Sequence, residues 1–168
     1  GGYIALPDYG FKFLVGLVLL FSAVRLLIDS KVEISATSPS LPAALAAGAQ
    51  ELAVFAAASE TFSQANTNCT IAEAVARFIP VMTLAGNAGV RVRGYVSCAL
   101  DCPYEGEIAP QAVAEVSVRL AAIGCFEIAV SDTIGRGTPE RTARMVEAVL
   151  GMVPAGQLAG HFHDTSGQ

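Results

Sequence analysis

The sequence has 168 residues, which suits one domain, and its 53% hydrophobic and 15% charged residues supply ample material for a buried core. This composition excludes an intrinsically disordered chain, which combines low hydrophobicity with high net charge. The formal net charge is −5 and no basic run occurs, so we expect no nucleic-acid partner. The cysteines form no CxxC or zinc-ribbon pattern, and we expect reduced thiols in a cytoplasmic protein.

Residues 1–36 differ in character from the rest of the chain. The stretch 13–24 is almost entirely apolar between Lys12 and Arg25, but it is shorter than a usual membrane span of about 20 residues. The segment also lacks the basic start of a signal peptide. We rank a buried or poorly ordered terminal segment first, an aberrant coding stretch second and a membrane anchor last. We therefore treat 1–36 as unassigned and 37–168 as the domain, and we expect no membrane association.

Four short β-rich runs follow within residues 37–168, with helix-like stretches between them. The runs cover residues 51–58, 90–98, 126–132 and 158–163. A capping box at Thr70 marks the start of one helix, and first-position prolines at Pro110 and Pro139 mark two others. Gly89 and Gly124 follow the expected ends of the first two.

The alternation of strands and helices predicts an α/β fold of parallel strands joined by crossover helices. Polar residues after successive strands, Ser59, Ser97, Asp132 and His163, recur at spacings of 38, 35 and 31 positions. Such a period suits part of a TIM (β/α)8 barrel, with about four βα units recognisable, and an open doubly wound sheet is the alternative. Both folds carry their chemistry at the carboxyl ends of the strands.

Both histidines of the sequence fall in one tripeptide at the end of the last predicted strand. His161 and His163 are two positions apart, so strand alternation directs both side chains to one face. Neutral imidazoles are good ligands for a divalent transition metal, and a carboxylate can complete the set. The alternative is a pair of hydrogen-bonded strand-end residues without a metal. The concentration of both histidines in one place favours the metal site.

Other polar side chains gather at the ends of the neighbouring strands. Asp132 ends the third strand, where a carboxylate can assist proton transfer, hold a metal-bound water, orient a neighbour or cap a helix. Arg93, Tyr95 and Ser97 share one face of the second strand, and Thr133 follows Asp132. A buried arginine must meet either a substrate anion or a carboxylate of a neighbouring strand, and both alternatives stay open.

Five ordered motifs become specific when they are read together. They are Phe55-Ala56-Ala57-Ala58-Ser59-Glu60, Arg93-Gly94-Tyr95-Val96-Ser97-Cys98, Cys102-Pro103-Tyr104-Glu105-Gly106, Asp132-Thr133-Ile134-Gly135 and Gly160-His161-Phe162-His163-Asp164-Thr165. In this order they resemble the motifs of the 3-hydroxy-3-methylglutaryl-CoA lyase family, in the DRE-TIM metallolyase superfamily. The resemblance covers residues 37–168 and does not include residues 1–36.

The resemblance implies a (β/α)8 barrel enzyme that cleaves 3-hydroxy-3-methylglutaryl-CoA to acetyl-CoA and acetoacetate, in leucine degradation and ketone-body formation. It implies Mg²⁺ or Mn²⁺ as cofactor, with His161 and His163 as metal ligands and with His161 and Asp132 as catalytic residues. An acyl-CoA substrate, a homodimer of the full-length protein and, in a eukaryote, the mitochondrial matrix are implied as well. The substrate-binding candidates are Arg93, Tyr95, Ser97 and Thr133.

The chain also departs from the family pattern. Position 101 is Asp where glycine is common, and Arg136 and Ser166 stand in loops where the family has other residues. We do not find the family's first strand, with its arginine and aspartate, or its C-terminal cysteine and asparagine. We therefore expect these 168 residues alone to be inactive. The alternatives are a pyruvate carboxyltransferase-like barrel domain, against which residues 93–98 argue, and a non-catalytic degenerate barrel fragment.

Overall fold

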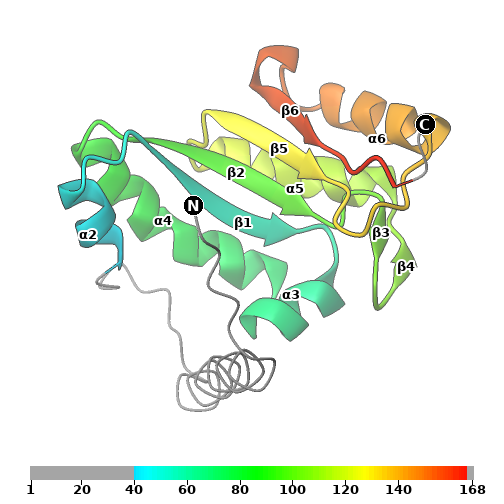
Figure 1. The fold of residues 1–168 in the computed structure, drawn as a ribbon, viewed down its shortest axis with the longest axis horizontal. Coiled ribbons are helices and arrows are strands. Elements are labelled where there is room, and N and C mark those ends of the chain that lie inside the picture. The colour runs from blue at the N-terminus through cyan, green and yellow to red at the C-terminus, as the bar shows by residue number, and fades with distance from the viewer. Residues whose placement is uncertain (1–39, 166–168) are drawn as a thin grey trace, which may run out of the picture. The chain divides into compact units, whose positions relative to one another are not determined.

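The computed structural model describes residues 40–165. These residues form a four-stranded parallel sheet with helices between its strands (Figure 1). The predictions for residues 1–36 and for Ser166 lie outside the described residues. The order of the strands in the sheet is their order in the sequence, and every neighbouring pair is parallel, as predicted. The strands are β1 (Glu51–Ala57), β2 (Arg91–Ser97), β5 (Glu127–Ser131) and β6 (Leu158–His161).

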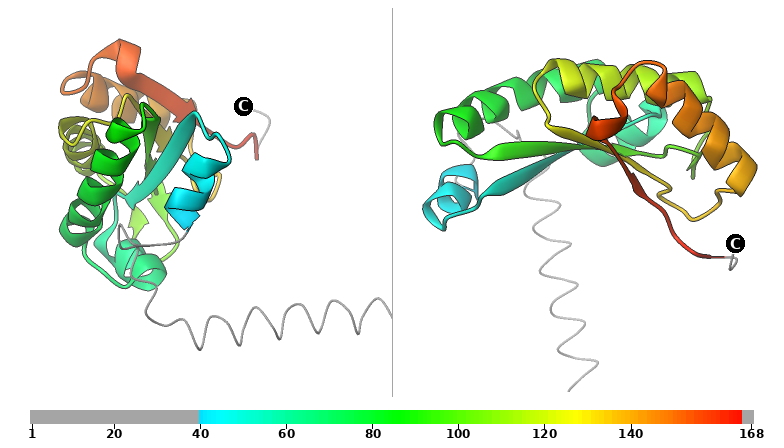
Figure 2. Two further views of the ribbon diagram at one scale, coloured as in Figure 1. Left: turned by 90° about the vertical axis from the view of Figure 1, so that its left-hand side faces the viewer. Right: turned by 90° about the horizontal axis from the view of Figure 1, so that it is seen from above.

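Three long helices lie between successive strands and cover the same face of the sheet (Figure 2). They are α4 (Ile71–Asn87), α5 (Pro110–Ala122) and α6 (Pro139–Leu150). A doubly wound sheet carries helices on both faces and reverses its strand order, whereas a (β/α)8 barrel keeps the sequence order with its helices outside. The arrangement is therefore part of a barrel, and the doubly wound alternative is wrong.

The helices begin where the local sequence predicts. At the start of α4 the Thr70 hydroxyl accepts a hydrogen bond from the Glu73 N–H, and the Glu73 carboxylate accepts one from the Thr70 N–H, so the capping box is formed. Pro110 is the first residue of α5, where its missing N–H costs nothing. The Thr138 hydroxyl caps α6 by accepting from the Arg141 N–H.

Smaller elements fill the connections between strands and helices. Helix α3 (Glu60–Thr67) follows β1, and the Ser59 hydroxyl caps it by accepting from the Phe62 N–H. A short hairpin, β3 (Asp101–Cys102) with β4 (Gly106–Glu107), follows β2. Neither α3 nor this hairpin was predicted. Helix α2 (Ser40–Ala46) precedes β1, and the 3-10 turn η1 (Ala155–Gln157) precedes β6.

The hydrophobic core lies between the sheet and the three long helices. Val96 and Ile128 project from the strands into it, and Leu120 of α5 and Met145 of α6 are buried against them. Gly94 permits a close approach of the sheet to α5, because a β-carbon there would lie 3.1 Å from the side chains of Leu120 and Cys125. Because the helices cover one face of the sheet, only the opposite face can contact a ligand.

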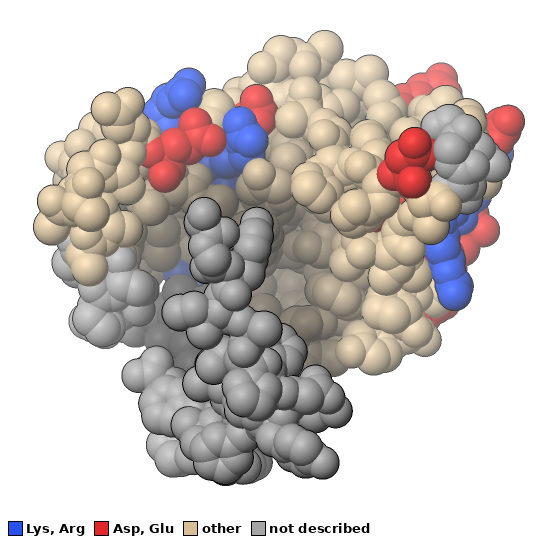
Figure 3. All heavy atoms as spheres, in the orientation of Figure 1, with Lys and Arg blue, Asp and Glu red and all other residues tan. Residues whose placement is uncertain are grey.

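The opposite face of the sheet carries polar and aromatic side chains. Its charged groups gather at the amino end of β1 and β2, where Figure 3 shows neighbouring basic and acidic side chains, and Arg91 lies 3.2 Å from Glu51. Within residues 40–165 no single helix is long and apolar enough to cross a membrane. Helices α3 and α4 taken together have the length and the apolar composition of a membrane span, but they are bent by 56° relative to each other.

Candidate active site at the carboxyl ends of the strands

His161 and His163 lie at the carboxyl end of β6 and line the same cavity, as their spacing predicts. His161 is the last residue of β6 and pairs in register with Ser131, whereas His163 lies two residues beyond the strand. The two rings are nearly perpendicular, with centroids 5.3 Å apart. Both side chains are exposed, so a ligand can reach them. The cavity has a volume of about 220 Å³ and its lining residues are Phe55, Tyr95, Ser97, Ser131, Thr133, His161 and His163.

One ring nitrogen of His163 is committed to the main chain. Its Nδ1 lies 2.7 Å from the carbonyl oxygen of Asp132. A carbonyl oxygen only accepts hydrogen bonds, so Nδ1 carries the proton, and in the neutral ring Nε2 keeps its lone pair. Metal-binding histidines usually donate their second ring N–H in this way, which fixes the tautomer and the orientation of the ring.

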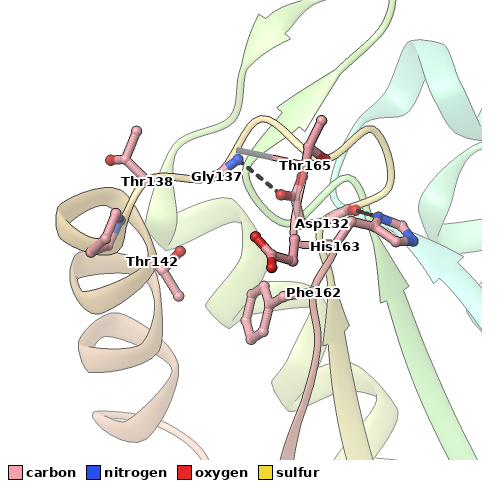
Figure 4. Close-up of a pocket in the computed structure, with 10 residues that line it drawn as sticks. Asp132, Gly137, Thr138, Thr142, Phe162, His163 and Thr165 are labelled. Atoms are coloured by element: carbon pink, nitrogen blue, oxygen red, sulfur yellow. Dashed lines mark hydrogen bonds between the residues drawn. The ribbon is translucent and has the colours of Figure 1, made fainter. Parts of the chain in front are cut away.

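Asp132 lies one strand away from the histidines at the same end of the sheet, but its carboxylate does not line their cavity. The side chain is 2% exposed, and its two oxygens accept hydrogen bonds from the N–H groups of Gly137, at 2.8 Å, and Arg136, at 3.2 Å. Asp132 lines a neighbouring cavity of about 300 Å³ together with His163 and the first turn of α6. Figure 4 shows the side chains of Asp132 and His163 beside this turn. The carboxylate therefore organises the loop after β5.

Three of the four substrate-binding candidates lie around the histidines. Tyr95, Ser97 and Thr133 line the two-histidine cavity. The Thr133 hydroxyl also accepts a hydrogen bond of 2.7 Å from the Cys98 N–H. Cys98 has a backbone φ of +58°, which is unusual for a residue other than glycine. The hydrogen bond to Thr133 therefore holds a strained turn directly after β2.

Arg93, the fourth candidate, is not in the cavity. Its Nε lies 2.8 Å from Glu127 Oε1 and 3.4 Å from Glu51 Oε1, so it pairs with carboxylates of both neighbouring strands. It precedes Tyr95 by two residues, which places it one layer further toward the amino end of the sheet. Of the two alternatives for this arginine, the structure shows carboxylate pairing, and a role of Arg93 in substrate binding stays an untested prediction.

Two lining residues were missed by the sequence interpretation. Phe55 is 59% exposed and stacks on Tyr95 with ring centroids 4.7 Å apart, and Ser131 lies beside His161. The signal for both was strand alternation, because Phe55 and Ser131 occupy the positions level with Tyr95 and His161 once the strands are in register.

The residues present fit two positions of a metal's coordination shell. Two accessible imidazoles converge, and His163 keeps Nε2 free for a ligand bond. Within residues 40–165 no group of three histidine, cysteine or carboxylate side chains is close enough to hold an ion. Divalent ions take at least four ligands, so the two histidines hold an ion only together with further donors from water, substrate or other protein groups.

The fold and the site together define part of a (β/α) barrel with an active-site edge built from strand ends. The chain matches the family model described as HMGL-like over residues 27–168 and belongs to the HMGL-like family. This confirms the family predicted from the motifs, and the match begins before residue 37. The family is one of metal-dependent lyases.

Curated relatives and solved structures agree with this assignment. The chain is 52% identical over 140 residues to the 3-hydroxy-3-isohexenylglutaryl-CoA/hydroxy-methylglutaryl-CoA lyase of Pseudomonas aeruginosa, covering 82% of this chain and 47% of that protein. The HMG-CoA lyase structure from Brucella melitensis has a TM-score of 0.74 and 55% identity, over 76% of this chain and 45% of the other. The chain therefore spans less than half the length of the relatives it matches.

A third comparison includes a bound molecule. An HMG-CoA lyase structure from Acinetobacter baumannii, in complex with coenzyme A and 3-methylmalate, has a TM-score of 0.68 and 31% identity over 76% of this chain and 41% of that one. Relatives of this family are named both as cytoplasmic and as mitochondrial proteins.

Proposed function

We propose that this chain supplies two metal ligands, His161 and His163, to an enzyme that cleaves 3-hydroxy-3-methylglutaryl-CoA into acetyl-CoA and acetoacetate. The observation that carries the proposal is the pair of imidazoles lining one cavity, with Nε2 of His163 left free by its bond to Asp132. The identity to lyases named for this substrate supports the choice of reaction.

Mg²⁺ or Mn²⁺, when bound, supplies a Lewis acid that polarises the oxygens of the substrate. On the protein side, His161 and His163 hold the ion, and the side chains of Tyr95 and Ser97 line the same cavity, where they contact the substrate. The Thr133 hydroxyl accepts from Cys98 and keeps its own proton to donate.

In this proposal Asp132 acts on the site indirectly, through the groups that it holds in place. Its carboxylate is occupied by two main-chain N–H groups and its carbonyl oxygen by His163. We assign Asp132 as a positioning residue that fixes the loop after β5 and the ring of His163. In this proposal His161, and not Asp132, contacts the reacting atoms.

The proposal extends to partners of the whole protein. An acyl-CoA substrate agrees with the coenzyme A bound in the Acinetobacter baumannii neighbour. A homodimer of the full-length protein, and a cytoplasmic or mitochondrial-matrix location, stay part of the proposal.

A chimeric enzyme tests the function directly. The segment of the Pseudomonas aeruginosa lyase that matches residues 40–165 is replaced by these residues, and acetoacetate release from 3-hydroxy-3-methylglutaryl-CoA is followed with Mg²⁺. We expect turnover within about tenfold of the parent enzyme. His161→Asn and His163→Asn should each lower turnover more than about 100-fold, because even outer-shell partners of metal ligands are worth 10–100-fold.

The alternatives give different results in the same experiment. The 168-residue chain alone, with excess Mg²⁺, should release acetoacetate at less than about a tenth of the parent's rate, since its two imidazoles leave an ion under-ligated. A folded chimera that, when supplied with carboxybiotin, transfers the carboxyl group from carboxybiotin to pyruvate would favour the carboxyltransferase alternative. A folded chimera with neither activity would contradict the proposed function and favour the non-catalytic fragment.

A further inference from the structure

The hairpin β3–β4 joins two connections that are far apart in the sequence. On one side, Glu105 accepts a hydrogen bond of 2.9 Å from the Thr61 N–H at the start of α3. On the same side the Ser59 hydroxyl lies 3.1 Å from the Cys102 sulfur. The hairpin is therefore fixed to the connection after β1.

On its other side the hairpin is held by a single side chain of α6, Arg141. Its Nη1 donates to Asp101 Oδ2 at 2.7 Å and its Nη2 donates to the Leu100 carbonyl oxygen at 2.7 Å. Its Nε also lies 3.5 Å from Glu107 Oε1. The side chains of Arg141 and Asp101 are only 20% and 10% exposed, so solvent screens this pair less than a surface ion pair.

Arg141 also reaches the loop that carries Asp132. Its Nη1 donates to the Arg136 carbonyl oxygen at 3.3 Å. The side chain of Leu100, whose carbonyl Arg141 holds, packs so closely on Gly137 that a β-carbon there would lie 2.5 Å from Leu100 Cδ1. Arg136 and Gly137 are the two residues whose N–H groups bind the Asp132 carboxylate.

A continuous set of contacts therefore runs from Arg141 through the loop to Asp132, and from the Asp132 carbonyl oxygen to His163 Nδ1. We propose that Arg141 is a positioning residue, which holds the loop after β5 so that His163 keeps its Nδ1–H tautomer and presents Nε2 to a divalent cation. The inference rests on the proposed function for the identity of the ligand, but not for the orientation of the ring.

The planar guanidinium is needed for this role. It donates to a carboxylate and two carbonyl oxygens at once, in a fixed fork that an ammonium group does not reproduce. Arg141→Met removes every donor and keeps the apolar stem, and Arg141→Lys keeps the charge without the fork. Arg144→Met changes an exposed arginine of the same helix and is the matched control.

The first measurement is the tautomer of His163 by ¹⁵N NMR of the 168-residue protein, at a pH where both imidazoles are neutral. The sequence has two histidines, so His161→Asn assigns the two ring spectra. We expect wild type and Arg144→Met to show His163 protonated at Nδ1. Arg141→Met and Arg141→Lys should show a substantial Nε2–H population.

The second measurement is Mn²⁺ binding, followed by the electron paramagnetic resonance signal of the free ion. We expect Arg141→Met to raise the Kd about tenfold, in the range of other residues that orient metal ligands. If Arg141→Met does not fold, as judged by circular dichroism, the tautomer and the Mn²⁺ Kd of Arg141→Lys test the proposal instead. An Nδ1–H tautomer and a Kd within twofold of wild type in the folded variant would overturn the proposal. Absence of Mn²⁺ binding in wild type would count against the proposed function, while the tautomer would still decide the role of Arg141.

Discussion

The imidazole Nδ1 of His163 donates a hydrogen bond to the main-chain carbonyl oxygen of Asp132 at 2.7 Å. The bond joins two neighbouring strand ends, because Asp132 follows β5 and His163 follows β6. It means that Asp132 influences the histidine through its backbone while its carboxylate binds the loop. This contact is therefore one route by which changes in the loop are expected to reach the ring of His163.

Replacing the Asp132 carboxylate by an amide should destabilise the protein. Asp132→Asn keeps one acceptor and turns an NH₂ group toward a main-chain N–H, in a site that is 2% exposed. We expect a loss of about 2 kcal/mol in the free energy of unfolding, the usual range for hydrogen bonds to charged groups. Urea unfolding measures it, with Asp164→Asn, an exposed carboxylate of the neighbouring strand end, as control. Equal effects of the two substitutions would contradict the assigned role of Asp132.

Removing the Thr133 hydroxyl should leave a strained turn without its partner. Thr133→Val has the same shape but cannot accept from the Cys98 N–H, and an unsatisfied main-chain donor costs about 1–3 kcal/mol. Thr133→Ser retains the hydroxyl and should cost much less. Both are compared by urea unfolding, and a Val variant as stable as the Ser variant would show that water replaces the hydroxyl.

The capping box of α4 should make stability depend on acid pH. Hydrogen bonds from the Thr70 N–H and hydroxyl lower the pKa of Glu73 below its ordinary value. A carboxyl whose pKa is lower in the folded state stabilises it above the unfolded pKa, and this stabilisation disappears as the pH falls through the folded pKa. Glu73→Gln should therefore be less stable than wild type at pH 7, and the difference should shrink as the pH falls below the ordinary glutamate range. A difference in urea midpoint that is independent of pH would contradict a role for the Glu73 charge.

Two buried thiols should resist alkylation in the native protein. Burial raises the pKa of Cys98 to about 12 and that of Cys125 to about 11, and both are free cysteines. The thiolate is the reactive form, so at pH 8 we expect iodoacetamide to label both at least about 100-fold more slowly than in urea. Mass spectrometry of the peptides gives the rates. Rapid labelling of Cys98 without unfolding would contradict its burial.

Sequence patterns predicted the parts of the fold whose signals are local. The Thr70 capping box, the helix start at Pro110 and the alternation of strands and helices all lie within short windows. Helix α3 escaped prediction because its sequence, residues 60–67, is mostly polar and lacks an apolar stripe. The β3–β4 hairpin has strands of two residues each and is held by contacts with residues 40 and 44 positions away.

The same distinction holds for the candidate site. The facing of His161 and His163 follows from alternation, which needs no partner strand. The partner of Arg93 depends on the register that places it opposite Glu127, and the stacking of Phe55 depends on its register with Tyr95. The unusual Asp101 was seen in the sequence only as a departure, whereas the structure pairs it with Arg141, 40 positions further along the chain.

The central claim is that His161 and His163 bind one divalent cation, and calorimetric titration of the purified protein with Mn²⁺ tests it most directly. Both rings line one cavity, so each should contribute to the same site. We predict binding of one ion per chain, with His161→Asn and His163→Asn each weakening it at least about tenfold, and with no measurable binding in the double variant. Mn²⁺ binding by the double variant that is as tight as that of wild type would place the ion elsewhere and contradict the claim.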